Sequence, residues 1–149
     1  MPKSRLEAFS DGVLAIIITI MVLELHVPAG GDGDALRPLV PLLLSYALSF
    51  VYLGIYWSNH HHMLQVVERV DGGILWANLH LLFWLSLFPY GTAWLGDHYR
   101  DPVPVAAYGV IQLCAGFAYY ILSRLLIVRH GADSTLARAV GRDVKGLVS

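Results

Sequence analysis

Three long stretches without a formal charge constrain this chain more than any other feature. Residues 38–59, 72–96 and 103–123 contain no Asp, Glu, Lys or Arg. Each is long enough to cross a bilayer as a helix, which takes about 20 mostly apolar residues. A fourth run, residues 13–23, is apolar except for Thr19. The sequence therefore predicts an all-α, polytopic membrane helical bundle with four transmembrane helices.

Composition supports the same class, because 56% of the residues are hydrophobic and 14% are charged, against about 45–50% and 25% in globular proteins. Pro89 predicts a kink or break near residues 86–88 of the third helix. The chain is expected to form one membrane domain, residues 1–149, that ends in an amphipathic tail lying at the interface. The predicted helices are 6–26, 38–60, 72–96 and 103–128, and the tail is 133–149.

The cations predict the orientation. Of the ten Lys and Arg residues, only Arg37 and Arg100 belong to the side opposite the N-terminus. The positive-inside rule then places both termini in the cytoplasm, in a multi-pass protein of the cell (plasma) membrane. Glu7 and Asp11 precede the first apolar run and Glu24 interrupts its end, which fits a cleaved signal peptide poorly.

Asp11 has two interpretations. As part of Ser10-Asp11-Gly12 it suits the cap of a helix that begins there. If the helix begins one turn earlier, Asp11 lies inside it and needs a partner in the bundle interior. Trp57, His60 and Asn78 are expected at the same membrane depth, and all three can donate hydrogen bonds to a carboxylate.

The histidines predict no metal site. Residues 60–62 are three successive histidines, which point about 100° apart on a helix and do not converge on one ion. His80 is expected to be a hydrogen-bonded interior histidine. No nucleophile–base arrangement or phosphate loop indicates an enzyme, and neither a cofactor nor a nucleic-acid partner is expected.

Thr19 also has two interpretations. Its hydroxyl can donate back to the carbonyl of Ala15. Alternatively, it faces a pore, on a stripe that its helical spacing defines. The other faces of this helix are apolar as well, so periodicity does not choose between them. The stripe consists of Ile16, Thr19, Ile20 and Leu23.

RLEAFSDGVLAIIITIMVLEL resembles the first-helix signature of the transmembrane protein 175 family. The core of that signature is formed here by Arg5, Phe9, Ser10 and Asp11. Residues 44–64, with a Trp-x-x-His pattern, and residues 70–94 resemble the family's second and third helices.

The resemblance implies a homo-tetrameric channel that passes potassium ions through the bilayer, without the carbonyl filter of ordinary potassium channels. It implies that the first helix lines the pore, with a hydrophobic constriction at Ile16, a pore-facing Thr19 and a further apolar ring at Leu23. It also implies a polar network near the cytoplasmic end, made of Arg5, Ser10, Asp11, Trp57, His60 and Asn78.

Family members have six helices in this domain, whereas four are predicted here. A chain that is naturally short and one that stops before two further helices both fit this count. Two other functions stay open. One is a haem or electron-transfer protein that uses His60 and His80, and the other is a non-conducting short relative that acts in assembly.

Overall fold

The computed structural model describes residues 2–130, and every regular element in that range is a helix. Four stretches are long and apolar enough to cross a membrane: α1, η1 with α2, α3 with α4, and α5. The predicted tail, residues 133–149, lies outside the described residues. The elements are α1 (Lys3–Leu23), the 3-10 helix η1 (Gly33–Leu39), α2 (Val40–Gln65), α3 (Gly72–Ser86), α4 (Phe88–Asp97) and α5 (Pro102–His130).

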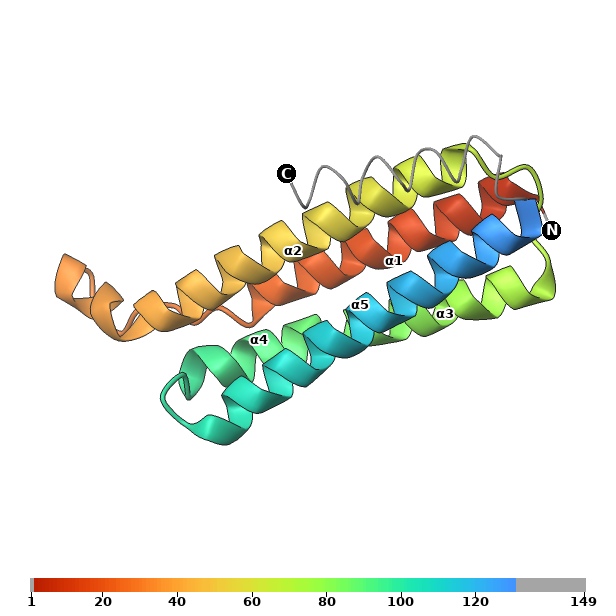
Figure 1. The fold of residues 1–149 in the computed structure, drawn as a ribbon. Coiled ribbons are helices and arrows are strands. Elements are labelled where there is room, and N and C mark those ends of the chain that lie inside the picture. Colours follow the sequence, from red (N-terminus) through yellow and green to blue (C-terminus); the bar gives the residue numbers. More distant parts are fainter. Residues whose placement is uncertain (1, 131–149) are drawn as a thin grey trace, which may run out of the picture.

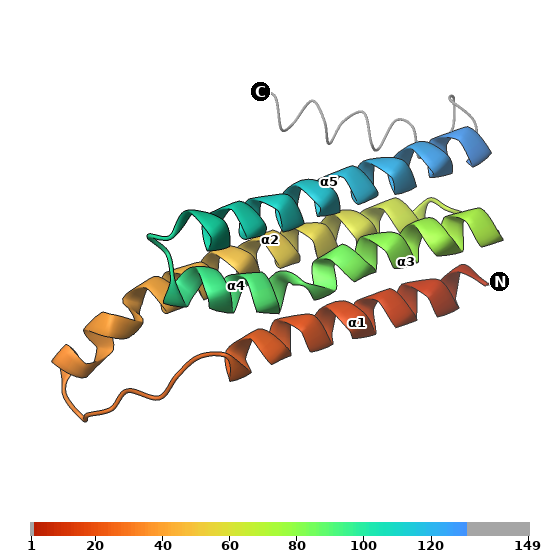
Figure 2. The ribbon, with the colours of Figure 1, turned by 90° about the horizontal axis from the view of Figure 1, so that it is seen from below.

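The four stretches lie side by side as an elongated bundle (Figure 1). The start of α1, the α2–α3 connection and the last turns of α5 gather at one end, called here the N-terminal end. η1 and the α4–α5 connection lie at the other, the η1 end. α1 packs against α2, α3 and α4, while α5 packs against α3 and α4. Figure 2 shows α1 and α5 on opposite sides of the bundle. One side of α1 is therefore left without another helix of residues 2–130 against it.

The third stretch is broken in two, as Pro89 predicts. α3 ends at Ser86 and α4 begins at Phe88, with Leu87 between them. Proline has no N–H to donate, and its ring clashes with the carbonyl four residues earlier in a continuous helix. The ladder resumes where the N–H of Gly91 donates to the carbonyl of Leu87 at 3.0 Å. The break redirects α4 toward α2.

The first helix begins earlier than predicted. α1 starts at Lys3 after Pro2, with no side-chain cap, and ends at Leu23, so the range 6–26 was three residues late. Asp11 lies in the third turn, and its interpretation as a helix cap is wrong. The turn before it holds good helix formers, and the side chain of Leu6 is fully buried. Tertiary packing of that turn outweighs the capping preference of Ser10 and Asp11.

The α4 helix approaches α2 very closely at Gly96. A Cβ atom added at Gly96 would lie 2.7 Å from the Cα atom of Leu42, so only glycine fits this crossing. Small residues allow such approaches between membrane helices, which associate through packing rather than through expulsion of water. The largest fully buried side chains are Phe88, Leu6, Leu14, Met21, Leu53, Leu64, Ile74, Leu81, Leu85, Leu122 and Leu126.

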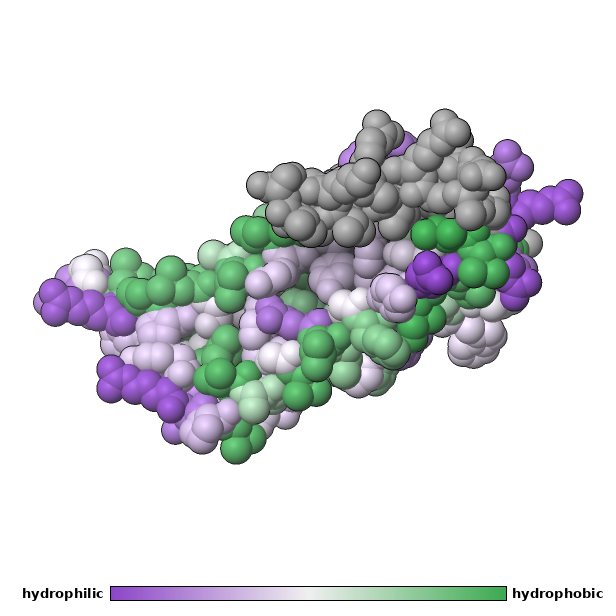
Figure 3. Space-filling model, viewed as in Figure 1, coloured by the Kyte–Doolittle hydropathy of each residue, from purple (hydrophilic) through white to green (hydrophobic). Residues whose placement is uncertain are grey.

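The exterior is also apolar along much of its length. Large hydrophobic side chains are exposed on α1, α2, α3 and α5, among them Leu44, Trp76, Leu113 and Val128. On the face in Figure 3, hydrophobic residues run along the bundle, and most strongly hydrophilic ones lie toward its ends. This distribution suits helices that contact lipid or other subunits around their circumference.

Candidate functional site

α1 has one face that the rest of the chain covers. Ser10 is fully buried, and the other members of this face are no more than 4% exposed. Their spacing of three and four residues is that of one side of an α-helix. This covered face is defined by Leu6, Ser10, Leu14, Ile17 and Met21.

The four residues of the predicted stripe lie on the uncovered side of the same helix. The exposed fractions are 59% for Ile16, 41% for Ile20 and 81% for Leu23, and Thr19 is exposed as well. Among residues 2–130, the α2, α3 and α4 helices bury the other face of α1 and leave this stripe open to lipid, another subunit or a pore.

An apolar groove with a volume of about 650 Å³ runs between α1 and α4 along one edge of this stripe. Ile16 and Ile20 line it from α1. Pro89, Tyr90 and Trp94 line it from α4, the half-helix that the proline break sets off. The break therefore shapes the surface beside the stripe as well as the backbone of the third span.

The hydroxyl of Thr19 donates to the carbonyl of Ile16 at 3.0 Å. The local hydrogen bond expected for this threonine therefore exists, but its acceptor is the carbonyl three residues back, instead of that of Ala15. A hydroxyl has one donor and two acceptor lone pairs. Because the proton is used inside the helix, the oxygen of this exposed residue keeps its acceptor capacity for a group outside it.

Three of the predicted network residues form a continuous buried chain at the N-terminal end. The amide nitrogen of Asn78 donates to Ser10 Oγ at 2.9 Å, and Ser10 Oγ donates to the carbonyl of Leu6 at 2.8 Å. Asn78 Oδ1 lies 2.6 Å from His60 Nε2. Since that oxygen only accepts, His60 carries its proton on Nε2. The chain connects α1, α2 and α3 through side chains that are at most 1% exposed.

The other three predicted network residues, and Phe9 of the first-helix signature, lie outside this set of hydrogen bonds. Trp57 Nε1 donates to Asp11 Oδ1 at 3.1 Å, across the boundary between α2 and α1. Arg5 and Phe9 are exposed on α1. The guanidinium group of Arg5 makes no hydrogen bond or ion pair within residues 2–130. The structure thus brings together Ser10, Asn78 and His60, and separately Asp11 and Trp57.

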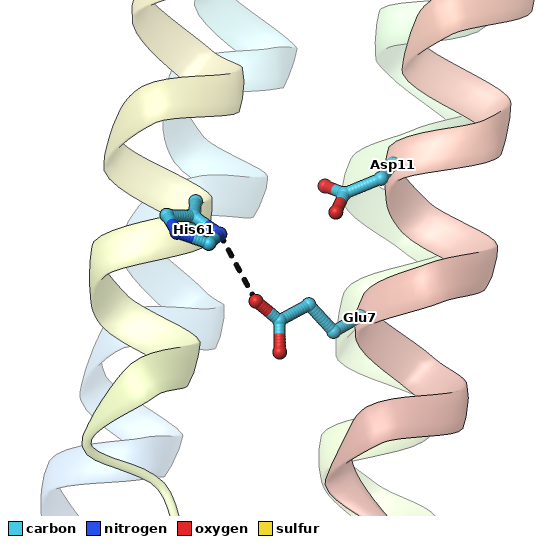
Figure 4. Close-up of side chains that lie close together, drawn as sticks. All are labelled: Glu7, Asp11 and His61. Atoms are coloured by element: carbon cyan, nitrogen blue, oxygen red, sulfur yellow. Dashed lines mark ion pairs between the residues drawn. The ribbon is translucent and has the colours of Figure 1, made fainter.

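Sequence reasoning missed a second polar contact between the same helices. His61 Nδ1 lies 3.0 Å from Glu7 Oε1, and Asp11 lies one turn further along α1 (Figure 4). The ligand atoms of Glu7, Asp11 and His61 are all within 4.8 Å of one another. The signal in the sequence was the i, i+4 spacing of two carboxylates opposite a histidine. To recognise this signal, one has to know which face of α2 is turned toward α1, and hydrophobic periodicity did not give that.

A buried hydroxyl cluster near the η1 end was also missed. Ser49 Oγ lies 2.6 Å from Thr92 Oγ1 and 2.8 Å from the hydroxyl of Tyr108. These residues come from α2, α4 and α5, and all three are buried. The cluster joins α2 to α4 and α5, and these last two helices are not reached by the hydrogen bonds of Ser10, Asn78 and His60. Each end of the bundle therefore has its own polar connection.

His80 is not an interior residue, contrary to the expectation for it. It is exposed on α3, and its Nε2 accepts a hydrogen bond from Trp84 Nε1 at 2.9 Å. The buried side of α3 at this point is occupied by Asn78, Leu81 and Leu82, so the side chain of His80 points outward. Its partner is one turn away on the same helix, a contact that needs no other element.

Comparisons with known proteins agree with this arrangement. The profile of the family described as endosomal/lysosomal potassium channel TMEM175 matches residues 5–89. A potassium channel of Chryseobacterium sp. (strain P1-3) is 54% identical over 149 residues, which are 100% of this chain and 78% of the relative. A potassium channel of Streptomyces collinus is 36% identical over 128 residues, 80% of this chain and 62% of the relative.

A solved structure has the same fold. It is the crystal structure of a lysosomal potassium-selective channel TMEM175 homolog from Chamaesiphon minutus, with a TM-score of 0.78 and 33% sequence identity. The similarity covers 86% of this chain and 73% of that one. The residues that the family profile matches, 5–89, include the covered face and the stripe of α1 and the residues that connect it to α2 and α3.

Proposed function

The chain belongs to the TMEM175 family, and on that premise we propose that it forms a potassium-permeable channel whose pore is lined by α1. Two bacterial relatives, one of them 54% identical over the full length of this chain, are named potassium channels. The activity of such a channel is ion conduction and not catalysis. The proposal includes the cell membrane as the location of the protein. It also places both termini in the cytoplasm, because most Lys and Arg residues belong to the same side of the membrane as the N-terminus.

The observation that carries this proposal is the division of α1 into two apolar faces. The face with Leu14 is covered by the other helices of the chain, whereas 59% of Ile16, two residues further on, is exposed. One helix that keeps a stripe of three apolar residues and one threonine away from its own bundle suits an assembly in which several copies present that stripe to a common axis. We propose a homo-tetramer, in which each subunit supplies one α1 helix.

In this tetramer the stripe provides both closure and ion contact. Rings of Ile16 and Leu23 exclude water when they are close together, and apolar constrictions of this kind block ions by dewetting. Thr19 lies between them and presents a hydroxyl oxygen whose proton is already donated to the Ile16 carbonyl. Four such oxygens form a ring of acceptors for a partly dehydrated cation. Ile20 completes the stripe beside the α1–α4 groove.

The buried chain of Ser10, Asn78 and His60 has a supporting role in this proposal. It fixes the rotation of α1 against α2 and α3 by groups that would be costly to leave without partners inside a bundle. Rotation of α1 by one residue would turn the stripe by about 100°. Such a chain therefore holds the pore-facing side chains in register, without itself touching an ion.

The haem alternative is less favoured. His60 Nε2 is hydrogen-bonded to Asn78, and His80 Nε2 accepts from Trp84, so both rings are engaged with neighbouring side chains. His60 is buried between helices, whereas His80 is exposed on the exterior. An axial pair that converges on one haem needs two histidines that face a common cavity.

The proposal is tested by potassium flux into liposomes that contain this chain, with oligomer mass measured in parallel. We expect a tetramer and a potassium flux above that of empty liposomes. A protein that is folded and tetrameric but passes no potassium would favour the alternative of a non-conducting relative that acts in assembly. A folded monomer would contradict the proposed pore.

A further inference from the structure

Two carboxylates and one imidazole converge between α1 and α2 near the N-terminal end. Glu7 and Asp11 are one turn apart on α1, and His61 faces them from α2 (Figure 4). Their ligand atoms are within 4.8 Å of one another, and all three residues are of intermediate exposure. These are side chains that bind metals, drawn from two helices. His61 Nδ1 is itself buried and has no hydrogen-bond partner among the described residues.

The interatomic distances fit a metal centre. His61 Nδ1 and Glu7 Oε1 are 3.0 Å apart. Two ligand atoms at about 2.1 Å from one zinc ion and at a tetrahedral angle are about 3.4 Å apart, so a small side-chain rotation suffices. Asp11 uses one carboxylate oxygen to accept from Trp57 Nε1, which leaves its second oxygen for a cation.

Neighbouring side chains already orient the histidine. Its Nε2 is 3.0 Å from the amide of Gln65, and its ring stacks on that of Trp57 with a centroid separation of 6.0 Å. The Gln65 atom at this distance is the amide nitrogen Nε2, which donates to the ring. A metal on Nδ1 requires the imidazole proton on Nε2, so the Gln65 amide must turn over and present its oxygen as the acceptor. Such a contact to the second ring nitrogen is the usual support of a metal-binding histidine. Trp57 serves twice, because it also holds Asp11.

Charge favours a divalent ion at this position. Glu7 and Asp11 are like charges at i, i+4, which repel each other on a helix. A protonated His61 compensates only one of them. The side chains of His61 and Glu7 are 36% and 22% exposed, so the local dielectric lies below that of water and a nearby cation interacts more strongly. The nearby Lys3 ammonium donates to the carbonyl of Gln65 at 3.1 Å.

We propose that Glu7, Asp11 and His61 bind one Zn²⁺ ion per chain and thereby join α1 to α2. An imidazole ligand favours zinc and similar transition ions over Mg²⁺ and Ca²⁺, which prefer all-oxygen sites. Three protein ligands leave the fourth position for water. The site lies on the α1–α2 boundary of a single chain, so its occupancy depends neither on conduction nor on the proposed tetramer.

The test is a calorimetric Zn²⁺ titration of the full chain, purified in detergent and stripped with a chelator. We expect one saturable site per chain in the wild type. His61→Gln and Glu7→Gln should each weaken Zn²⁺ binding at least about tenfold, since loss of even a supporting contact typically costs 10–100-fold. His62→Gln is the matched control, because His62 is the exposed neighbour of His61 outside this cluster, and it should bind as the wild type does.

Thermal unfolding of the same proteins gives a second measurement. Zn²⁺ should raise the unfolding midpoint of the wild type and of His62→Gln, and Mg²⁺ should not. Absence of a saturable Zn²⁺ site in the wild type would overturn the proposal. The proposal would also be overturned if both His61→Gln and Glu7→Gln bound Zn²⁺ as tightly as the wild type. The same holds if Mg²⁺ raised the unfolding midpoint as much as Zn²⁺. The two variants change different helices, so if one of them fails to fold, the other still tests the proposal.

Discussion

The two faces of α1 are similar in hydropathy but differ in what covers them. Leu14 and Ile17, on one face, are at most 4% exposed, whereas Ile16 and Leu23, on the other, are 59% and 81% exposed. Hydropathy alone assigns both faces to an apolar environment. The difference teaches that the fold of one chain uses the first face and leaves the second for assembly. Substitutions on the two faces should therefore affect different properties.

The largest expected difference is between Leu14→Ala and Ile16→Ala. Removal of a fully buried leucine side chain costs about 2–5 kcal/mol, while a substitution at an exposed position usually changes stability by less than about 0.5 kcal/mol. Reversible unfolding in detergent micelles measures both values. Equal destabilisation by the two substitutions would break the comparison, because it would mean that the chain's own packing depends equally on both faces.

Asn78→Leu should have the next largest effect. It removes the amide between Ser10 and His60, and leaves the buried His60 Nε2 proton without its acceptor, which costs about 1–3 kcal/mol. Trp76→Leu on the same helix is the control, because Trp76 is 71% exposed. The unfolding midpoint should fall for Asn78→Leu and stay close to the wild type for the control. An unchanged midpoint for both would show that the covered face of α1 needs no polar connection.

Asp11→Asn should have a smaller effect. The residue lies beside the covered face, is partly exposed, and accepts one hydrogen bond from Trp57. Asparagine keeps an acceptor oxygen but loses the charge, so we expect a loss of about 1 kcal/mol and a weaker oligomer. The ratio of potassium to sodium permeability should not change. A shifted reversal potential in mixed potassium and sodium would move Asp11 into the ion path.

Thr19→Val should have the smallest effect on stability, within about 0.5 kcal/mol, and a specific effect on conduction. The substitution nearly keeps the volume but deletes the hydroxyl oxygen that is proposed to contact the ion. We expect a modest preference for potassium over sodium in the wild type and a smaller one in the variant. The measurement is the reversal potential of each protein. Strong selectivity that survives the substitution would place the filter in another element.

The spans could be predicted from the sequence because charges are excluded from the bilayer interior, and that exclusion leaves long uncharged stretches. The break in the third span could be predicted because Pro89 lacks a backbone donor and clashes sterically wherever it sits in a helix. The start of α1 was predicted at residue 6 and lies at Lys3. The sequence left the cap at Ser10 and Asp11 open because a capping preference is a local property, whereas the burial of Leu6 in the first turns of the helix is a tertiary one.

Contacts that depend on helix rotation were harder to predict. Membrane depth led to the expectation that Trp57, His60 and Asn78 are partners of Asp11. Only Trp57 bonds to Asp11, whereas Asn78 bonds to His60 and Ser10 instead. Membrane depth did not predict that His61, one position further than His60, turns toward Glu7. It also did not predict the outward direction of His80. In helices that are apolar on every side, periodicity carries little information about rotation, and only packing between helices fixes it.

The central claim is that the stripe of α1 faces an ion path, and Ile16→Asn tests it most directly. An asparagine at an apolar constriction should hydrate it and raise the basal potassium flux into liposomes. Val22→Asn is the matched control, because Val22 is also exposed on α1, at 47%, but lies outside the stripe. With both variants tetrameric, we predict raised flux for Ile16→Asn alone. Unchanged flux for Ile16→Asn, or an equal rise for Val22→Asn, would contradict the claim.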